Sequence, residues 1–436
     1  MTDRTGIAHD GSAAADEDDG NLTVALFHYV PRPRQFKDAL LSAWKRLVPA
    51  PTVGLRFTNY DCYYHDAAHR PDVFVFDSLY LRHFVHRQDL LPLPEALPTA
   101  SEDFQDWALQ ASAVDGTRYG IPCHGCMNIF FYRADDRDLD PDGAGPLTLG
   151  ALRRIIGEAA PTDEPAPPPG EGLLLDLTGR TTCAGLYLES WLDVHGADDP
   201  YPPLPRVPFH TFDPAALANL ETLRAMAGDA QAGYLDKKAT RRLNWFLQGR
   251  GQALIGFTEM LTHVPAPSLL RFRPLPLSEA TTPYQFVYVN LASVSSAISP
   301  AKQEPALRLL DLMTSTDVMV HSLRPDSSGA NPQNPQFIIP ARRTVLDTLT
   351  AETPGYRAIA DLIAGDAGRP CRPFQWGPTS GQATMRAMGG NLRKDLLPGN
   401  NLKVGSGLES GSELSDYDRE APEDEKWLPA NLFRRN

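Results

Sequence analysis

The chain has 436 residues, more than one hydrophobic core usually supports, so we expect at least two lobes. Its 42% hydrophobic and 22% charged residues, with 40 prolines that form no repeat, fit a globular protein and exclude a collagen-like or proline-rich scaffold. A formal net charge of −13 argues against nucleic-acid binding, which needs a basic face, and is compatible with a cationic small-molecule ligand.

The chain begins with an acidic tail. Residues 1–20 are small, polar and acidic, and they lack the basic start and apolar core of a secretory signal. We therefore expect a cytoplasmic protein, with a signal that has been removed as the open alternative. No stretch approaches the roughly 20 apolar residues that span a bilayer, so no membrane partner is expected.

The next stretch alternates between strand and helix patterns. Apolar runs predict strands over residues 22–27, 53–57 and 72–76, and helical spacing predicts helices over 35–47 and 79–86. This alternation predicts an α/β fold with a parallel sheet and right-handed crossovers. Ligands on such sheets bind at the carboxyl ends of the strands. The candidate binding residues at those ends are Phe27, Tyr29, Tyr63 and Asp77.

The segment 119–133 carries most of the chemical information. Its second half contains the apolar run 129–132, which predicts a buried strand, and its first half has the glycine and proline of a turn. Cys126 then lies just before the strand, where it faces a cleft as a candidate nucleophile. A cysteine is nucleophilic only as the thiolate and needs a base beside it. An inert buried cysteine is the alternative.

Cys123 and Cys126 also form a C-x-x-C motif, which occurs in redox and metal sites. No second C-x-x-C and no following histidine cluster is present, so we expect no metal. A thioredoxin-like motif opens a helix, whereas this one precedes a strand; thiol redox chemistry stays open as an alternative. The five cysteines have irregular spacing, unlike the disulfide framework of a secreted protein: Cys62, Cys123, Cys126, Cys183 and Cys371.

The remaining patterns supply further elements and a candidate base. They predict helices over residues 146–160, 186–194, 214–227, 238–248 and 300–315, strands over 252–257 and 284–292, and loops over 161–172 and 331–340, with a short helix from 341. Glu259 follows a predicted strand among apolar neighbours, which raises a carboxyl pKa and suits a general base. A strand-end carboxylate that faces water is the alternative.

Other side chains near these strand ends suit ligand binding. Tyr29, Tyr63 and Tyr288 offer flat faces on which a heteroaromatic or cationic ligand stacks. Asp77 either accepts a hydrogen bond from an amino group of a ligand or caps the next helix.

The order of elements predicts two lobes connected by two crossings. Lobe 1 is expected to comprise residues 21–122 and about 262–310, and lobe 2 residues 123–261 and about 311–398, with tails over 1–20 and 399–436. Two crossings give a hinged molecule with a central cleft, and Cys126 and Glu259 are expected beside the crossings.

Several segments, taken in order, resemble the thiaminase I (thiamine pyridinylase) family. They are residues 26–31, 72–78, 119–122, 125–133 and 256–259. The resemblance runs from about residue 22 to 290, and weaker similarity continues beyond. It implies a two-lobed type II periplasmic-binding-protein-like α/β fold with a central ligand cleft.

The resemblance also implies roles for individual residues. Cys126 matches the nucleophile of the family and Glu259 its general base. The positions that match the lining of the pyrimidine-binding cleft are Tyr29, Tyr63, Asp77 and Tyr288. Three positions depart from the family: Phe27 and Phe257 stand where tyrosines are expected, and Asn290 where an aspartate is expected. The exact pyrimidine substrate therefore stays open.

The implied activity is a transferase that cleaves thiamine, or an analogue, between the pyrimidine methylene and the thiazolium. Cys126 forms a covalent intermediate, and an organic base or a thiol then receives the pyrimidine. This chemistry needs no cofactor and no metal, and we expect a monomer whose partners are the substrate and the nucleophilic co-substrate. Because fold does not fix function, a non-catalytic solute-binding or sensor protein for a thiamine-like ligand is the alternative.

Overall fold

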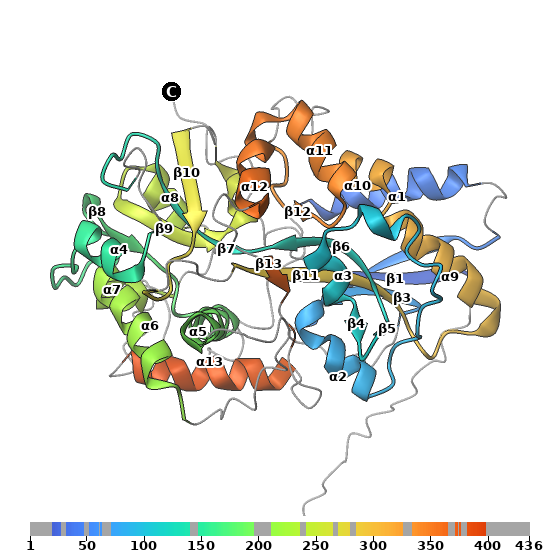
Figure 1. Cartoon of the computed structure of the whole chain (residues 1–436), viewed down its shortest axis with the longest axis horizontal. Coiled ribbons are helices and arrows are strands. Elements are labelled where there is room, and N and C mark those ends of the chain that lie inside the picture. The colour runs from blue at the N-terminus through green and yellow to red at the C-terminus, as the bar shows by residue number, and fades with distance from the viewer. Residues whose placement is uncertain are drawn as a thin grey trace, which may run out of the picture.

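The computed structural model contains two main β-sheets that lie side by side, each with its own helices, and its described residues also form a short two-stranded sheet (Figure 1). It describes residues 20–27, 32–47, 52–60, 62, 71–139, 147–195, 211–235, 241–264, 269–279, 285–325, 334–364, 371–373, 375 and 382–397. Within these ranges no helix has the length and apolar character needed to cross a membrane.

The larger sheet has seven strands in the described part of the chain. They are β1 (Leu22–Phe27), β2 (Leu55–Tyr60), β3 (Val73–Asp77), β6 (Ile121–Cys126), β11 (Gln285–Val294), β12 (Ile339–Pro340) and β13 (Cys371–Pro373). Their order is β12-β6-β11-β3-β1-β2, with β13 beside β11. The pairs of β1 with β2 and β3 are parallel, as predicted, whereas β11 runs antiparallel to both β3 and β6.

Helices and short elements surround this sheet. They are α1 (Pro33–Arg46), η1 (Ser78–Tyr80), α2 (Leu81–His86), η2 (Ser101–Asp103), α3 (Asp106–Ala111), β4 (Ala113–Val114), β5 (Thr117–Arg118), α9 (Pro300–Met313), α10 (Thr316–Leu323), α11 (Arg343–Glu352) and α12 (Pro354–Ala364). Helix α1 buries Leu40 and Trp44, which recur at helical spacing, and its first residue is a proline preset for a helix start.

The smaller sheet has the strand order β10-β7-β9-β8. Its strands are β7 (Asn128–Arg133), β8 (Pro169–Leu174), β9 (Gly251–Phe257) and β10 (Leu270–Pro274). Its helices are α4 (Leu149–Ile156), α5 (Arg180–His195), α6 (Pro214–Ala227), α7 (Asp229–Ala232), α8 (Arg241–Leu247), η3 (Thr258–His263) and α13 (Gln382–Leu396). Figure 1 shows this sheet at the left and the larger sheet at the right.

Strong local signals explain the elements that the sequence predicted well. Helix α6 spans the predicted residues because Asp213 caps it, accepting hydrogen bonds from the backbone amides of Ala215 and Ala216 at 3.0 and 2.9 Å. Pro214 opens the helix and Gly228 closes it with a φ of 78°. The acidic and polar tails lie outside the described residues.

Two predictions of loop or turn are wrong. Residues 121–126 form β6 instead of a turn. Pro122 is tolerated there because it borders a β-bulge at Cys123, which the register with β11 skips, and because β12 pairs only with His124 and Gly125. The predicted loop 161–172 ends at Pro169, where β8 begins. This edge strand pairs in parallel with β9 through Leu173 and Leu174.

The chain passes between the sheets at Met127, which joins β6 to β7, and between β10 and β11. The expected division placed residues 262–310 in lobe 1, but β10 pairs with β7 of the smaller sheet. Residues 311–398 were expected in lobe 2, but β12 and β13 belong to the larger sheet, while α13 packs against α5. Periodicity indicates that a segment is buried but not which sheet buries it, which explains both differences.

Candidate active site

The strand register brings four of the predicted site residues to one end of the larger sheet. Cys126, the last residue of β6, lies opposite Tyr288 of β11. Asn290 of β11 lies between Asp77, at the end of β3, and His124. Paired residues, and residues two apart in a strand, project to the same face of a sheet. These side chains therefore form two adjacent rows at the carboxyl ends of β3 and β6.

The smaller sheet brings Glu259 to the same junction. Phe257, at the end of β9, lies opposite Asn128, the first residue of β7. The next amide, that of Thr258, donates a 3.1 Å hydrogen bond to the carbonyl oxygen of Met127. Glu259, the second residue of η3, is thus adjacent to the residue that bonds Met127, which follows Cys126 and joins the two sheets.

The environment of Cys126 is negatively charged. Burial raises the pKa of the thiol well above its ordinary value, and the charges of Glu259, Asp77 and Glu189 raise it further. The side chain is partly buried and forms no disulfide. At neutral pH Cys126 is a thiol, so its activation needs a proton acceptor, a nearby positive charge, or both.

Glu259 has the properties of a proton acceptor. Burial raises the pKa of its carboxyl to about 7, against the hydrogen bonds that favour the charged form. One of these comes from the hydroxyl of Thr258, which donates to Oε2 at 3.4 Å. A carboxyl with a pKa near the working pH is well suited to accept and return a proton.

Glu189 of α5 is a residue of this site that sequence reasoning missed. Its side chain is buried, and its Oε1 accepts 2.6 Å hydrogen bonds from the Tyr288 hydroxyl and from Nδ2 of Asn128. Burial raises the pKa of the carboxyl to about 7. The available signal was an acidic residue inside the apolar run 186–192 of a predicted helix.

The other predicted binding residues have different environments. Oδ1 of Asp77 accepts a 2.8 Å hydrogen bond from the backbone amide of Leu79 and thereby caps η1. Oδ1 of Asn290 is buried and has no hydrogen-bond partner among the described residues. The ring of Phe257 meets that of Tyr288 edge-on, with centroids 5.8 Å apart. Tyr29 and Tyr63 lie outside the described residues.

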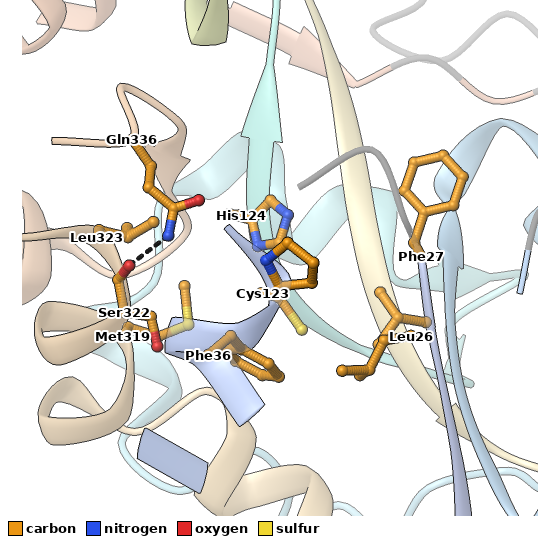
Figure 2. Close-up of a pocket in the computed structure, with 11 residues that line it drawn as sticks. Leu26, Phe27, Phe36, Cys123, His124, Met319, Ser322, Leu323 and Gln336 are labelled. Carbon is orange, nitrogen blue, oxygen red and sulfur yellow. Dashed lines mark hydrogen bonds between the residues drawn. The ribbon is translucent and has the colours of Figure 1, made fainter. Parts of the chain in front are cut away.

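Phe27 and His124 both line a small apolar pocket (Figure 2). The pocket encloses about 20 Å³, room for about one water molecule. Burial lowers the pKa of His124 to about 4, so its imidazole is neutral, and its Nε2 has no partner within the described ranges. The lining residues are Leu26, Phe27, Pro33, Phe36, Val75, Cys123, His124, Met319, Ser322, Leu323 and Gln336.

The second cysteine of the C-x-x-C motif differs from Cys126. Cys123 is buried, and burial raises the pKa of its thiol to about 12. Its Sγ donates a weak 3.8 Å hydrogen bond to the carbonyl oxygen of Ile121. A thiol of this kind reacts poorly, which weakens the redox interpretation.

Comparison with known proteins identifies relatives over most of the chain. A family model described as the Thiaminase-1 domain matches residues 127–278, the stretch that contains the whole smaller sheet. The Thiaminase-1 of Paenibacillus thiaminolyticus is 34% identical over 374 residues, which are 84% of this chain and 87% of that protein.

Solved structures agree with this result. The thiaminase I of Clostridium botulinum, in complex with thiamin, has a TM-score of 0.78 and 29% identity, covering 86% of this chain and 100% of that one. An ABC transporter solute-binding protein from Thermotoga lettingae has a TM-score of 0.60 at 15% identity, covering 88% and 95%, a likeness in fold alone. The type II periplasmic-binding-protein-like fold is thus confirmed. With this fold and a relative that matches it over most of its length, the chain belongs to the thiaminase-1 family.

Proposed function

We propose that this protein is a thiaminase I-type transferase. It cleaves thiamine, or a thiamine analogue, between the pyrimidine methylene and the thiazolium, and transfers the pyrimidine to an organic base or a thiol. Family membership supports the substrate class. The observation that carries the mechanism is the placement of Cys126 and Glu259 on either side of the crossing at Met127, with the charge of Glu259 acting on the thiol and burial raising the pKa of the Glu259 carboxyl to about 7.

The first half-reaction makes a covalent intermediate. Glu259 takes the proton from Sγ of Cys126, and the thiolate adds to a ring carbon of the pyrimidine. The bond between the methylene carbon and the thiazolium nitrogen then breaks. Its electron pair leaves on that nitrogen, so the departing thiazole is neutral.

The second half-reaction releases the enzyme. The incoming base or thiol adds to the methylene carbon, and the ring expels the sulfur of Cys126 as a thiolate. The thiolate takes back the proton that Glu259 received in the first half-reaction. Glu259, ionised again, then accepts the proton of the incoming group where that group carries one, and releases it to solvent. One carboxyl with a pKa near 7 serves both steps, because it can accept a proton in each and return it.

The charges around Cys126 favour a cationic substrate. Three carboxylates raise the pKa of the thiol: Glu259, Asp77 and Glu189. A bound thiazolium brings a positive charge into the same region and therefore lowers the pKa of Cys126. The thiolate then forms mainly in the complex, where the pyrimidine is ready to react.

Chromatography of thiamine incubated with the protein and excess aniline or pyridine tests this proposal. We expect loss of thiamine with release of free thiazole and a pyrimidine–amine adduct. Cys126→Ser should reduce turnover by at least about 10³-fold while thiamine binding, measured by calorimetry, stays within a few-fold. Tight binding without turnover by the wild type would favour the binding-protein alternative, and full activity of Cys126→Ser would remove the cysteine from the mechanism.

A further inference from the structure

We propose that Glu189 is a positioning residue for the transferase reaction, holding Tyr288 and Asn128 in place at the junction beside Cys126. This inference rests on the function proposed above. Glu189 lies on α5, one of the helices of the smaller sheet, and reaches a strand of each sheet. The sequence alone predicted no role for Glu189.

One oxygen atom of Glu189 joins three elements. Its Oε1 accepts from the hydroxyl of Tyr288, on β11 of the larger sheet, and from the amide of Asn128, on β7 of the smaller sheet, both at 2.6 Å. The carboxyl is 4% exposed, so water does not replace these bonds easily. Such short bonds to a carboxylate fix the direction of both donors.

A second observation on α5 is independent of these hydrogen bonds. Gly185 lies one turn before Glu189 on the same helix face. A Cβ at Gly185 would stand 2.8 Å from the hydroxyl oxygen of Tyr288, closer than van der Waals contact permits. Helix α5 therefore lacks a side chain where the Tyr288 hydroxyl lies and supplies its acceptor one turn later. Together these two residues form a seat for that hydroxyl.

The charge of Glu189 needs an explanation beyond hydrogen bonding. A glutamine would accept the same two hydrogen bonds without the free-energy cost of burying a carboxylate. Among the charged groups of the described residues that act on its pKa, Asp193 opposes ionisation and no lysine or arginine favours it. A carboxylate kept under these conditions binds its donors more strongly than an amide does, which holds Tyr288 rigidly.

The position of Tyr288 explains why rigidity matters. Tyr288 lies opposite Cys126, and its ring packs edge-on against Phe257, two residues before Glu259. Asn128 lies opposite Phe257 in the smaller sheet. Glu189 therefore contacts residues next to both reacting groups without contacting the reacting atoms. Its loss lets the Tyr288 ring turn, and a ligand then meets Cys126 and Glu259 in poorer alignment.

A double-mutant cycle on turnover of thiamine with aniline tests the role. We expect Glu189→Gln and Tyr288→Phe each to lower kcat/KM about tenfold, mainly through kcat, and the double variant to be no worse than the poorer single variant. A purely structural contribution of Glu189 would instead multiply the two losses, and wild-type kcat/KM in Glu189→Gln would overturn the proposal outright. The matched control is Asp89→Asn, which changes a buried carboxylate that pairs with Arg87 and does not act on the pKa of Glu189; we expect it to stay within about twofold.

A second cycle keeps the test open if Glu189→Gln fails to fold. Gly185→Ala should lower kcat/KM about tenfold because its methyl displaces the Tyr288 hydroxyl, and Gly185→Ala/Tyr288→Phe should be no worse than Tyr288→Phe alone, because the hydroxyl that the methyl displaces is then absent. Losses that multiply in the double variant would contradict the proposed seat. Wild-type turnover decides the proposed function, whereas the ratios among variants decide the role of Glu189.

Discussion

The two walls of the junction differ in the state of their polar groups. On the larger sheet, His124 and Asn290, which share a row with the carboxylate of Asp77, are uncharged, and each has a buried polar atom without a partner in the described part of the chain. On the side of the smaller sheet, Glu189 and Glu259 are carboxyls whose pKa values burial raises to about 7. The first wall has unused hydrogen-bonding capacity, which suits ligand binding, and the second has groups poised to exchange protons. Cys126 lies where the walls meet.

The largest expected effect on turnover comes from changing Glu259, one of the two carboxyls on the side of the smaller sheet. Glu259→Gln should lower kcat about 10²–10³-fold, because an amide accepts no proton from Cys126. The measurement is steady-state turnover of thiamine with aniline. Glu158→Gln, which changes an exposed glutamate bonded to Arg153, is the control and should leave kcat unchanged.

The pH dependence of the wild type sharpens this prediction. The pKa of Glu259 is about 7, and only the ionised carboxylate is a base, so kcat/KM should rise with pH up to about 7 and then level off. In the complex a cationic substrate favours the carboxylate, which moves the corresponding rise in kcat to lower pH. An unchanged acid limb in Glu259→Gln would assign that limb to another group.

The binding wall should respond differently. Asn290→Ala removes a buried acceptor, Oδ1, that is available to a ligand. We expect KM for thiamine to rise about tenfold with kcat within about threefold of the wild type. The opposite pattern, a fall in kcat at constant KM, would place Asn290 with the catalytic groups and erase the contrast between the walls.

Much of the fold was predictable because its signals are local. The apolar run Leu22–Phe27 and the capped helix Pro214–Ala227 have the predicted bounds. Placing the candidate binding residues at strand ends needed only the rule for parallel sheets, and Asp77 does lie at the end of β3. Cys126 and Glu259 were candidates because of their positions beside strands and because of the family resemblance; the structure places both beside Met127, and their catalytic roles stay predictions.

The features that the sequence did not predict depend on contacts between residues that are far apart in the chain. Glu189 and Tyr288 are 99 positions apart, and nothing in the helical pattern of α5 indicates that its carboxyl meets a tyrosine of β11. Strand β6 was mistaken for a turn because Pro122 and Gly125 disfavour strands, and only the pairing with β11 overrides that preference.

The pH dependence of the free energy of unfolding should also distinguish Glu189 from the uncharged polar residues of the site. The folded-state pKa of Glu189 is about 7, above its ordinary value of 4.5, so its protonated form stabilises the fold. That contribution is complete below about pH 4.5 and is lost as the pH rises through 7. The free energy of unfolding, measured with denaturant at pH 5 and pH 8, should therefore fall by about 2 kcal/mol less in Glu189→Gln than in the wild type. An equal fall in both proteins would mean that Glu189 ionises in the folded state as readily as in the unfolded one.

The smallest effect is expected at Cys123, which lies three residues before the proposed nucleophile but faces the small apolar pocket. Burial keeps it a thiol, with a pKa of about 12. Cys123→Ala should leave kcat/KM within about twofold and lower the free energy of unfolding by about 1 kcal/mol, since it removes only a buried sulfur. A redox mechanism requires both cysteines, so a loss of turnover equal to that of Cys126→Ala would support it. If Cys123→Ala keeps its activity, the two cysteines of the C-x-x-C motif have different roles: Cys123 packs in the interior and Cys126 takes part in the reaction.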